Sequence, residues 1–201
     1  MKKILLIQLL SISSLAIFGQ TRGEGEFHGN WVFGFPIGND FVTNFSALGA
    51  NFGYSRFIKD GVSVGVDLGW NNYYQYAPTK TYVSADGATT TDLYKYLYTL
   101  PITAFVSQFF HGNDVFTPYV KLGLGAQYSE QNLYYNIYET TNDNWGFVFM
   151  PEVGTLIHFN KQKHFGLNLS ARYTYGTNSA QYLGINNVQT VNFSVGFMYI
   201  K

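Results

Sequence analysis

The feature that most constrains this chain is the alternation along residues 188–199. Phe193, Val195 and Phe197 fall on one side of the alternation, and small or polar residues such as Asn192 and Ser194 fall on the other. Because a β-strand turns successive side chains to opposite faces, this segment has one large apolar face and one small polar face. A strand of this kind needs a different environment on each side.

Seven earlier segments alternate in the same way, and a period of two describes them better than a helical period does. They span residues 30–37, 47–57, 62–73, 93–110, 116–128, 145–158 and 165–175. The connections at 58–61, 111–115 and 159–164 are short, whereas those at 38–46, 74–92, 129–144 and 176–187 are longer. Short turns at one end and long loops at the other are typical of outer-membrane barrels. The sequence predicts an all-β fold, an eight-stranded antiparallel up-and-down transmembrane β-barrel whose last strand pairs with its first.

Composition favours a membrane barrel over a soluble one. Aromatic residues make up 19% of the chain and charged residues only 12%, compared with about 25% charged residues in ordinary soluble domains. A soluble lipocalin-like barrel would point its large apolar residues inward. Here the opposite face is rich in Gly, Ser, Asn and Thr, which suits the narrow interior of eight strands. The large face is therefore expected to meet lipid, with Tyr and Trp near the external rim and Phe near the periplasmic rim.

The start of the chain predicts export. Lys2 and Lys3 precede a short, interrupted apolar stretch and small residues, the pattern of a signal peptide over residues 1–20. Removal of that segment leaves residues 21–201 as the barrel domain, with 10 basic and 12 acidic residues, a net charge of −2. This balance argues against a nucleic-acid partner. The absence of cysteine excludes disulfides and Cys-based metal sites.

With these strands in place, the chain resembles the porin-like outer-membrane β-barrel family of Bacteroidetes-type bacteria. The resemblance covers most of residues 21–201 and is most specific at residues 97–102, 116–125, 171–176 and 192–199. It implies an OmpA-type, eight-stranded barrel in the outer membrane of a Gram-negative bacterium. Membrane lipid, lipopolysaccharide and the outer-membrane assembly machinery are its implied partners. Because members are defined mainly by fold, the resemblance implies little about activity.

Charged residues on the predicted inner face form one candidate site. They are Asp67, Lys95, Lys121, Glu152 and Arg172. At roughly 3.3 Å per residue, all of them except Lys95 lie within about 7 Å of one height in the barrel. Charges away from water persist when they are paired. We therefore expect a lumen ion network in which Glu152 pairs with Arg172 and Lys121, acting either as a structural plug or as the gate of a narrow channel.

Catalytic, cofactor and metal sites are not predicted. The histidines lie near the predicted periplasmic end, as rim or turn residues, without a neighbouring nucleophile or metal-ligand spacing; they are His28, His111, His158 and His164. No glycine-rich loop suited to phosphate is present. An enzyme at the external rim is thus the weakest of three hypotheses.

The long external loops form the second candidate site. Their tyrosines offer large contact area at low entropic cost, which suits a protein or glycan partner. An equally weighted alternative is a solvated collar above the membrane. The candidate contact residues are Tyr76, Tyr82, Tyr134, Tyr135 and Tyr138. The sequence thus favours a non-enzymatic envelope or binding protein, with a small-solute channel as the alternative.

Overall fold

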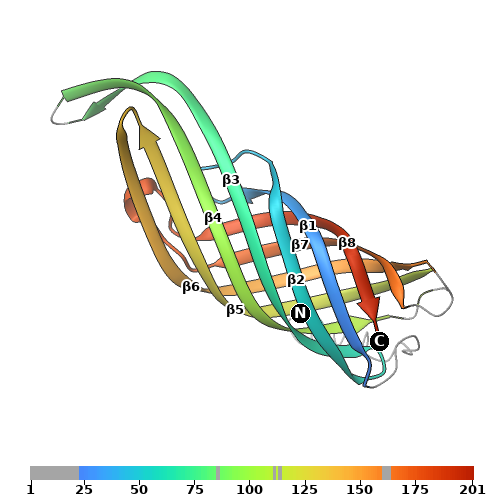
Figure 1. Cartoon of the computed structure of the whole chain (residues 1–201). Helices are drawn as coiled ribbons and strands as arrows, with labels where there is room; N and C mark the ends of the chain where they lie inside the picture. The colour runs from blue at the N-terminus through green and yellow to red at the C-terminus, as the bar shows by residue number, and fades with distance from the viewer. Residues whose placement is uncertain (1–22, 85–86, 111, 113–114, 160–163) are drawn as a thin grey trace, which may run out of the picture.

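Eight antiparallel strands close into a barrel within the part of the chain that the structure describes (Figure 1). This computed structural model describes residues 23–84, 87–110, 112, 115–159 and 164–201, so the predicted signal peptide lies outside it. The strands are β1 (Gly25–Ile37), β2 (Ser46–Lys59), β3 (Val62–Ser84), β4 (Gly87–Phe109), β5 (Phe116–Tyr135), β6 (Tyr138–His158), β7 (Phe165–Gly176) and β8 (Val188–Ile200), with a short 3-10 helix, η2 (Gln181–Leu183), between β7 and β8. The predicted fold class is confirmed.

Each strand pairs with the next along the chain, and β8 pairs with β1 to close the ring. That closing ladder runs from Glu26 opposite Ile200 to Ile37 opposite Gln189. The ladder leaves neither β1 nor β8 as an open edge, which would otherwise expose unpaired backbone groups. The predicted pairing of the last strand with the first is therefore correct.

The faces of the strands follow the predicted alternation. On β8, Phe197 is 67% exposed on the outer wall, while the adjacent Met198 is 1% exposed in the lumen. On β6, whose two faces are both apolar in sequence, Phe147, Phe149 and Val153 point outward as expected. Large apolar residues therefore cover the outside of the barrel.

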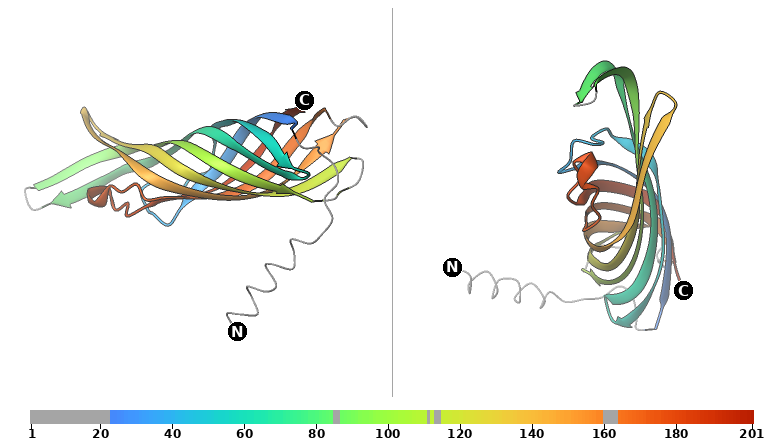
Figure 2. Two further views of the ribbon diagram at one scale, coloured as in Figure 1. Left: turned by 90° about the horizontal axis from the view of Figure 1, so that it is seen from below. Right: turned by 90° about the vertical axis from the view of Figure 1, so that its left-hand side faces the viewer.

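The strands β3 to β6 extend well beyond the other four at one end, which we call the projecting end (Figures 1 and 2). These strands have 20 to 23 residues, against 12 to 14 for the others. The expectation that residues 74–92 and 129–144 are loops is thus wrong: residues 74–84, 87–92, 129–135 and 138–144 continue the strands as the arms of two long hairpins. Tyr and Thr favour strands, and the ladder pairs β4 with β3 as far as Gly87 opposite Ser84.

The β5–β6 hairpin turns at Asn136, whose φ of +54° lies in the left-handed region that asparagine tolerates. At the opposite end, which we call the turn end, Gly61 adopts a φ of +71° in the predicted tight turn between β2 and β3. No helix in the described residues has the length and apolar character needed to cross a membrane.

The lumen contains more apolar side chains than its sequence pattern suggested. At the turn end the buried cluster consists of Phe57, Phe109, Tyr119, Leu156, Met198 and Ile200. At the projecting end it consists of Phe41, Val42, Tyr73, Leu97, Ala180, Ile185 and Val188. The expectation of an interior rich in Gly, Ser, Asn and Thr is therefore incomplete.

Two connections that were expected to be external loops pack into the projecting end of the barrel (Figure 2). In the β1–β2 connection, the Asn39 side chain accepts hydrogen bonds from the backbone N–H groups of Phe41 and Val42, which turns both residues inward. In the β7–β8 connection, the Asn178 amide donates to the carbonyl groups of Gln127 and Asn144. Tyr73, expected at the external rim, also points into this cluster.

A cavity in the turn-end cluster should destabilise the barrel. Leu156→Ala removes a side chain that is 1% exposed, and we expect it to lower the free energy of unfolding by about 2–5 kcal/mol. Urea titration of the detergent-folded protein, read by heat-modifiable gel migration, measures the change. Val153→Ala, on the outer wall of the same strand, is the control. An equal loss in both variants would mean that the cluster adds nothing beyond the outer surface.

Candidate functional site

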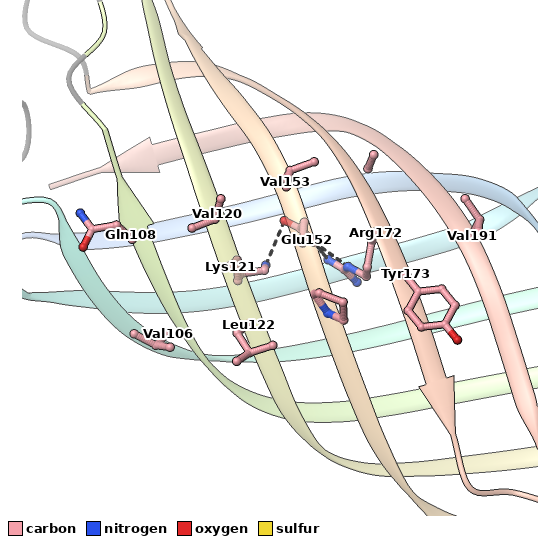
Figure 3. Close-up of a pocket in the computed structure, with 12 residues that line it drawn as sticks. Val106, Gln108, Val120, Lys121, Leu122, Glu152, Val153, Arg172, Tyr173 and Val191 are labelled. Atoms are coloured by element: carbon pink, nitrogen blue, oxygen red, sulfur yellow. Dashed lines mark hydrogen bonds and ion pairs between the residues drawn. The ribbon is translucent and has the colours of Figure 1, made fainter. Parts of the chain in front are cut away.

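The structure brings the four residues of the expected lumen network together near the middle of the barrel. The Lys121 Nζ donates to Asp67 Oδ2 at 2.7 Å and lies 3.4 Å from Glu152 Oε1. The Arg172 Nη2 lies 2.5 Å from Glu152 Oε2 and 3.8 Å from Asp67 Oδ2. None of these residues is more than 8% exposed. Figure 3 shows Lys121 and Arg172 converging on Glu152 from either side.

Sheet register explains these contacts. Lys121 on β5 lies directly opposite Glu152 on β6, which in turn lies directly opposite Arg172 on β7. Neighbouring residues on one face of paired strands have side chains within reach of each other. Asp67 comes from β3 and meets Lys121 across the lumen, because β4 lies between their strands.

Sequence reasoning missed two members of this cluster, Glu26 and His28. The His28 Nε2 lies 2.8 Å from Asp67 Oδ1, and its Nδ1 lies 3.4 Å from Glu26 Oε1. The interpretation of His28 as a rim or turn residue is therefore wrong, because β1 begins at Gly25, five residues before the predicted start. The alternation continues backward from Trp31 to Phe27, but Gly29 carries no side chain to mark the outer face.

The other histidines differ among themselves. His158, also expected at the rim or a turn, is buried, and its Nε2 lies 3.0 Å from Thr117 Oγ1. His164 is exposed beside the start of β7. His111 lies outside the described residues. No described group of three or more His, Asp or Glu side chains is placed to hold a metal ion.

The cluster's charges are nearly balanced. Three acidic side chains face the basic side chains of Lys121 and Arg172, and His28 lies between two of the acidic ones. The Tyr119 hydroxyl lies 2.7 Å from Glu152 Oε1 and 2.9 Å from Asn168 Oδ1, which links the cluster to a layer of buried amides. Pairing and hydrogen bonding compensate for removing these charges from water. The cluster therefore has the character of a cross-linked polar core.

One gap within the described part of the cluster is very small. The gap beside Glu26, His28 and Lys121 has a volume of about 10 Å³, roughly the minimum that one water molecule requires. A larger depression of about 640 Å³ lies on the outer wall over the cluster and is lined mainly by apolar residues, including Val106, Val120 and Val153 (Figure 3). Pro151 lies there, in a gap of the β6–β7 ladder, as expected of a residue without an N–H group.

Lys95, the fifth expected lumen charge, lies apart from the cluster. Its Nζ is 5.6 Å from the centre of the Phe41 ring at the projecting end. Burial lowers the pKa of this amine, and the charge of Asp40 partly opposes that effect. Lys95 therefore helps to close the projecting end of the barrel.

The second candidate site is a continuous tyrosine-rich surface on the outer side of the projecting β3–β6 sheet, which we call the tyrosine face. Its aromatic residues are Tyr74, Tyr76, Tyr94, Tyr96, Tyr98 and Tyr134, and adjacent rings lie 5.0–6.4 Å apart from centre to centre. Hydrogen bonding to Glu139 raises the pKa of Tyr134, and the charge of Asp92 raises that of Tyr94. The Tyr134 and Tyr94 phenols are therefore uncharged near neutral pH.

The five expected contact tyrosines are divided by the structure. Tyr76 and Tyr134 lie on the tyrosine face, on either side of Tyr94. Tyr82 is exposed near the end of β3. Tyr135 and Tyr138 pair at the β5–β6 turn, with ring centres 5.5 Å apart. Strand pairing also aligns Tyr74, Tyr94 and Tyr96 with Tyr76 and Tyr134, an alignment that sequence reasoning did not predict.

No protein-family profile and no curated protein matches the chain. Solved structures do. Neisserial surface protein A is 14% identical and has a TM-score of 0.55, with 89% of this chain and 99% of that chain covered. Ail, the attachment invasion locus protein of Yersinia pestis, is 14% identical and has a TM-score of 0.51, with 90% and 100% covered. These are eight-stranded outer-membrane barrels, so the chain shares their fold.

Removing one partner of the lumen cluster should destabilise the barrel strongly. Glu152→Gln leaves Arg172 buried without its carboxylate, and we expect a loss of about 3–5 kcal/mol in the free energy of unfolding. Adding Arg172→Met to this variant should recover part of the loss, since it removes the unpaired charge. Urea titration with gel readout measures both, and exposed Glu139→Gln is the control. A loss under about 1 kcal/mol for Glu152→Gln would show that the pair is dispensable.

Proposed function

We propose that this chain is an integral outer-membrane β-barrel that is not an enzyme, has a closed lumen, and uses its tyrosine face as an external contact surface. The proposal places it in the porin-like group of Bacteroidetes-type bacteria, with residues 1–20 cleaved after export. The observation that carries it is the continuation of β3–β6 as an ordered, tyrosine-bearing sheet beyond the apolar outer wall of the barrel.

The outer wall supports placement in a bilayer. Exposed Val66, Leu68 and Phe149 belong to an apolar band that a soluble protein would have to cover. Trp70 and the paired Tyr128 and Trp145 mark the projecting-end limit of this band, at the level where aromatic rings favour lipid headgroups. Membrane lipid and lipopolysaccharide would surround the band, and the assembly machinery would insert the barrel.

The lumen supports a structural role over a conducting one. An apolar cluster lies at each end, and the ion cluster between them leaves about 10 Å³ beside His28. A small-solute channel would require all three layers to separate. His28 and His158 are buried in the lumen. Their position does not favour an enzyme acting at the external rim.

The tyrosine face supports a binding role. Its rings are exposed or half-exposed, lie against one another across strands and are held by backbone ladders, so a partner would meet a surface that is already ordered. Tyrosine supplies large contact area at low entropic cost. The partner proposed from the sequence is a protein or a glycan.

Orientation can be tested by amine labelling. On intact cells, a membrane-impermeant amine reagent should modify Lys80 near the projecting tip, while Lys59 at the turn end should react only after the cells are broken. Mass spectrometry of the modified peptides measures this, with Lys80→Gln as the control for assignment. Modification of Lys59 on intact cells, with Lys80 protected, would reverse the proposed orientation.

Closure of the lumen can be tested by electrical recording. Wild type and Glu152→Ala should both show negligible conductance in planar bilayers, because the two apolar clusters remain when the ion cluster is broken. Steady currents in the wild type would support the channel. Currents that appear only in Glu152→Ala would identify the ion cluster as the barrier.

A further inference from the structure

The part of the tyrosine face nearest the barrel is acidic. Sheet register places Asn72, Tyr98, Glu130 and Asp143 in one row across β3, β4, β5 and β6. Glu130 and Asp143 are therefore directly opposite each other, and like charges in that position destabilise a sheet. Among the described residues, neither carboxylate has an ion pair with Lys, Arg or His. The row carries negative charge that the described protein does not neutralise.

A depression lies at this row, between the end of the apolar band and the tyrosines above it. It has a volume of about 310 Å³ and is lined by Trp70, Tyr98, Leu100, Tyr128, Glu130 and Asn132. Aromatic rings thus border a carboxylate and an amide. The pKa of Tyr98 is raised by burial first, and then by the neighbouring Tyr96 and Glu130.

Asn132 lines the same depression and holds a buried, unsatisfied acceptor. The residue is 6% exposed, and its Nδ2 donates to Glu130 Oε1 at 2.8 Å. Because a carboxylate accepts hydrogen bonds only from the amide nitrogen, this contact fixes the amide orientation. The Asn132 Oδ1 is then left buried without a hydrogen-bond partner, as is Oδ1 of the nearby Asn72. Such an acceptor carries a free-energy cost that a donor group would relieve.

These groups specify the chemistry of a ligand. Acceptor oxygens require N–H or O–H donors, the two carboxylates favour positive charge, and aromatic faces attract cations. An anion is disfavoured by Glu130 and Asp143. A metal ion is not indicated, since no described group of three His, Asp or Glu side chains is suitably placed. A neutral sugar would satisfy the acceptors but leave the charge uncompensated.

We propose that this depression is a binding site for an organic cation, a guanidinium or alkylammonium group. The cation lies against the rings of Trp70, Tyr98 and Tyr128 and beside the Glu130 carboxylate and the Asn132 side chain, which also line the depression. The inference rests on the proposed function, because the site faces the cell exterior only if the projecting end stands outside the membrane.

Ligand-observed saturation-transfer NMR tests the site on the folded barrel in a polyoxyethylene detergent, which contains neither choline nor sugar. The probes are acetylarginine amide for guanidinium, choline for quaternary ammonium and glucose as the neutral comparison. We expect saturable binding of at least one cation and none of glucose. Binding of the guanidinium alone points to a peptide side chain, and binding of choline alone points to a headgroup-like ligand.

Two matched variants distinguish specific binding at the depression from a general attraction of cations to negative charge. Glu130→Gln should weaken cation binding by at least about tenfold, because it removes the charge and keeps the shape. Glu139→Gln removes the same charge from the neighbouring strand β6, on the same face of the sheet but outside the depression, and should change binding less than about twofold. Tyr98→Leu should weaken choline binding through loss of a ring. Heat-modifiable migration confirms that each variant is folded.

Three outcomes would overturn the inference: no saturable binding of either cation, equal weakening by Glu130→Gln and Glu139→Gln, or saturable glucose binding that Glu130→Gln leaves unchanged. The last would identify a hydroxyl-rich ligand. Lys80 labelling on intact cells distinguishes a failure of the cation site from a failure of the proposed function. An exposed Lys80 without cation binding rejects only the site, whereas a protected Lys80 rejects the external placement.

Discussion

Closure of the sheet is the constraint on which the rest of this structure depends. The β1–β8 ladder satisfies the backbone groups of the two terminal strands and leaves no edge in the ring. A closed ring of eight strands has an interior that its own side chains fill. Every inward residue must therefore pack or find a polar partner, and this requirement produces the two apolar clusters and the ion cluster between them.

The lumen and the projecting sheet have different roles: the lumen cross-links the walls of the barrel, and the projecting sheet aligns the tyrosines. Inside, charges that come from β1, β3, β5, β6 and β7 cross-link distant walls, so that loss of one partner leaves another charge buried. Outside, β3–β6 use backbone ladders to hold tyrosines in register beyond the barrel. The rigid barrel thus helps to keep the tyrosine face ordered, although the projecting sheet does not have a hydrophobic core behind its full length.

Alternation was sufficient to predict the barrel-forming parts of the strands, their order and the direction of most of their side chains, because each strand there separates two different environments. The neighbouring charges Lys121, Glu152 and Arg172 followed from counting along strands of known spacing. Glu26 and His28 did not follow, because Gly29 interrupts the pattern that would have extended β1. The projecting parts of β3–β6 were misread as loops, because their many Thr, Asn and Tyr residues do not separate large apolar from small polar residues as the barrel strands do.

The sequence by itself determined the periodicity, the closing strand and the separation of large from small residues, since these are properties of neighbours along the chain. Only the tertiary structure decided which residues meet across the lumen, which connections pack into the projecting end of the barrel, and how the tyrosines align. Those contacts join residues far apart in sequence, as Asp67 with Lys121 and Tyr73 with Asn192 do. Their energies depend on strand register and on burial, and both exist only once the ring has closed.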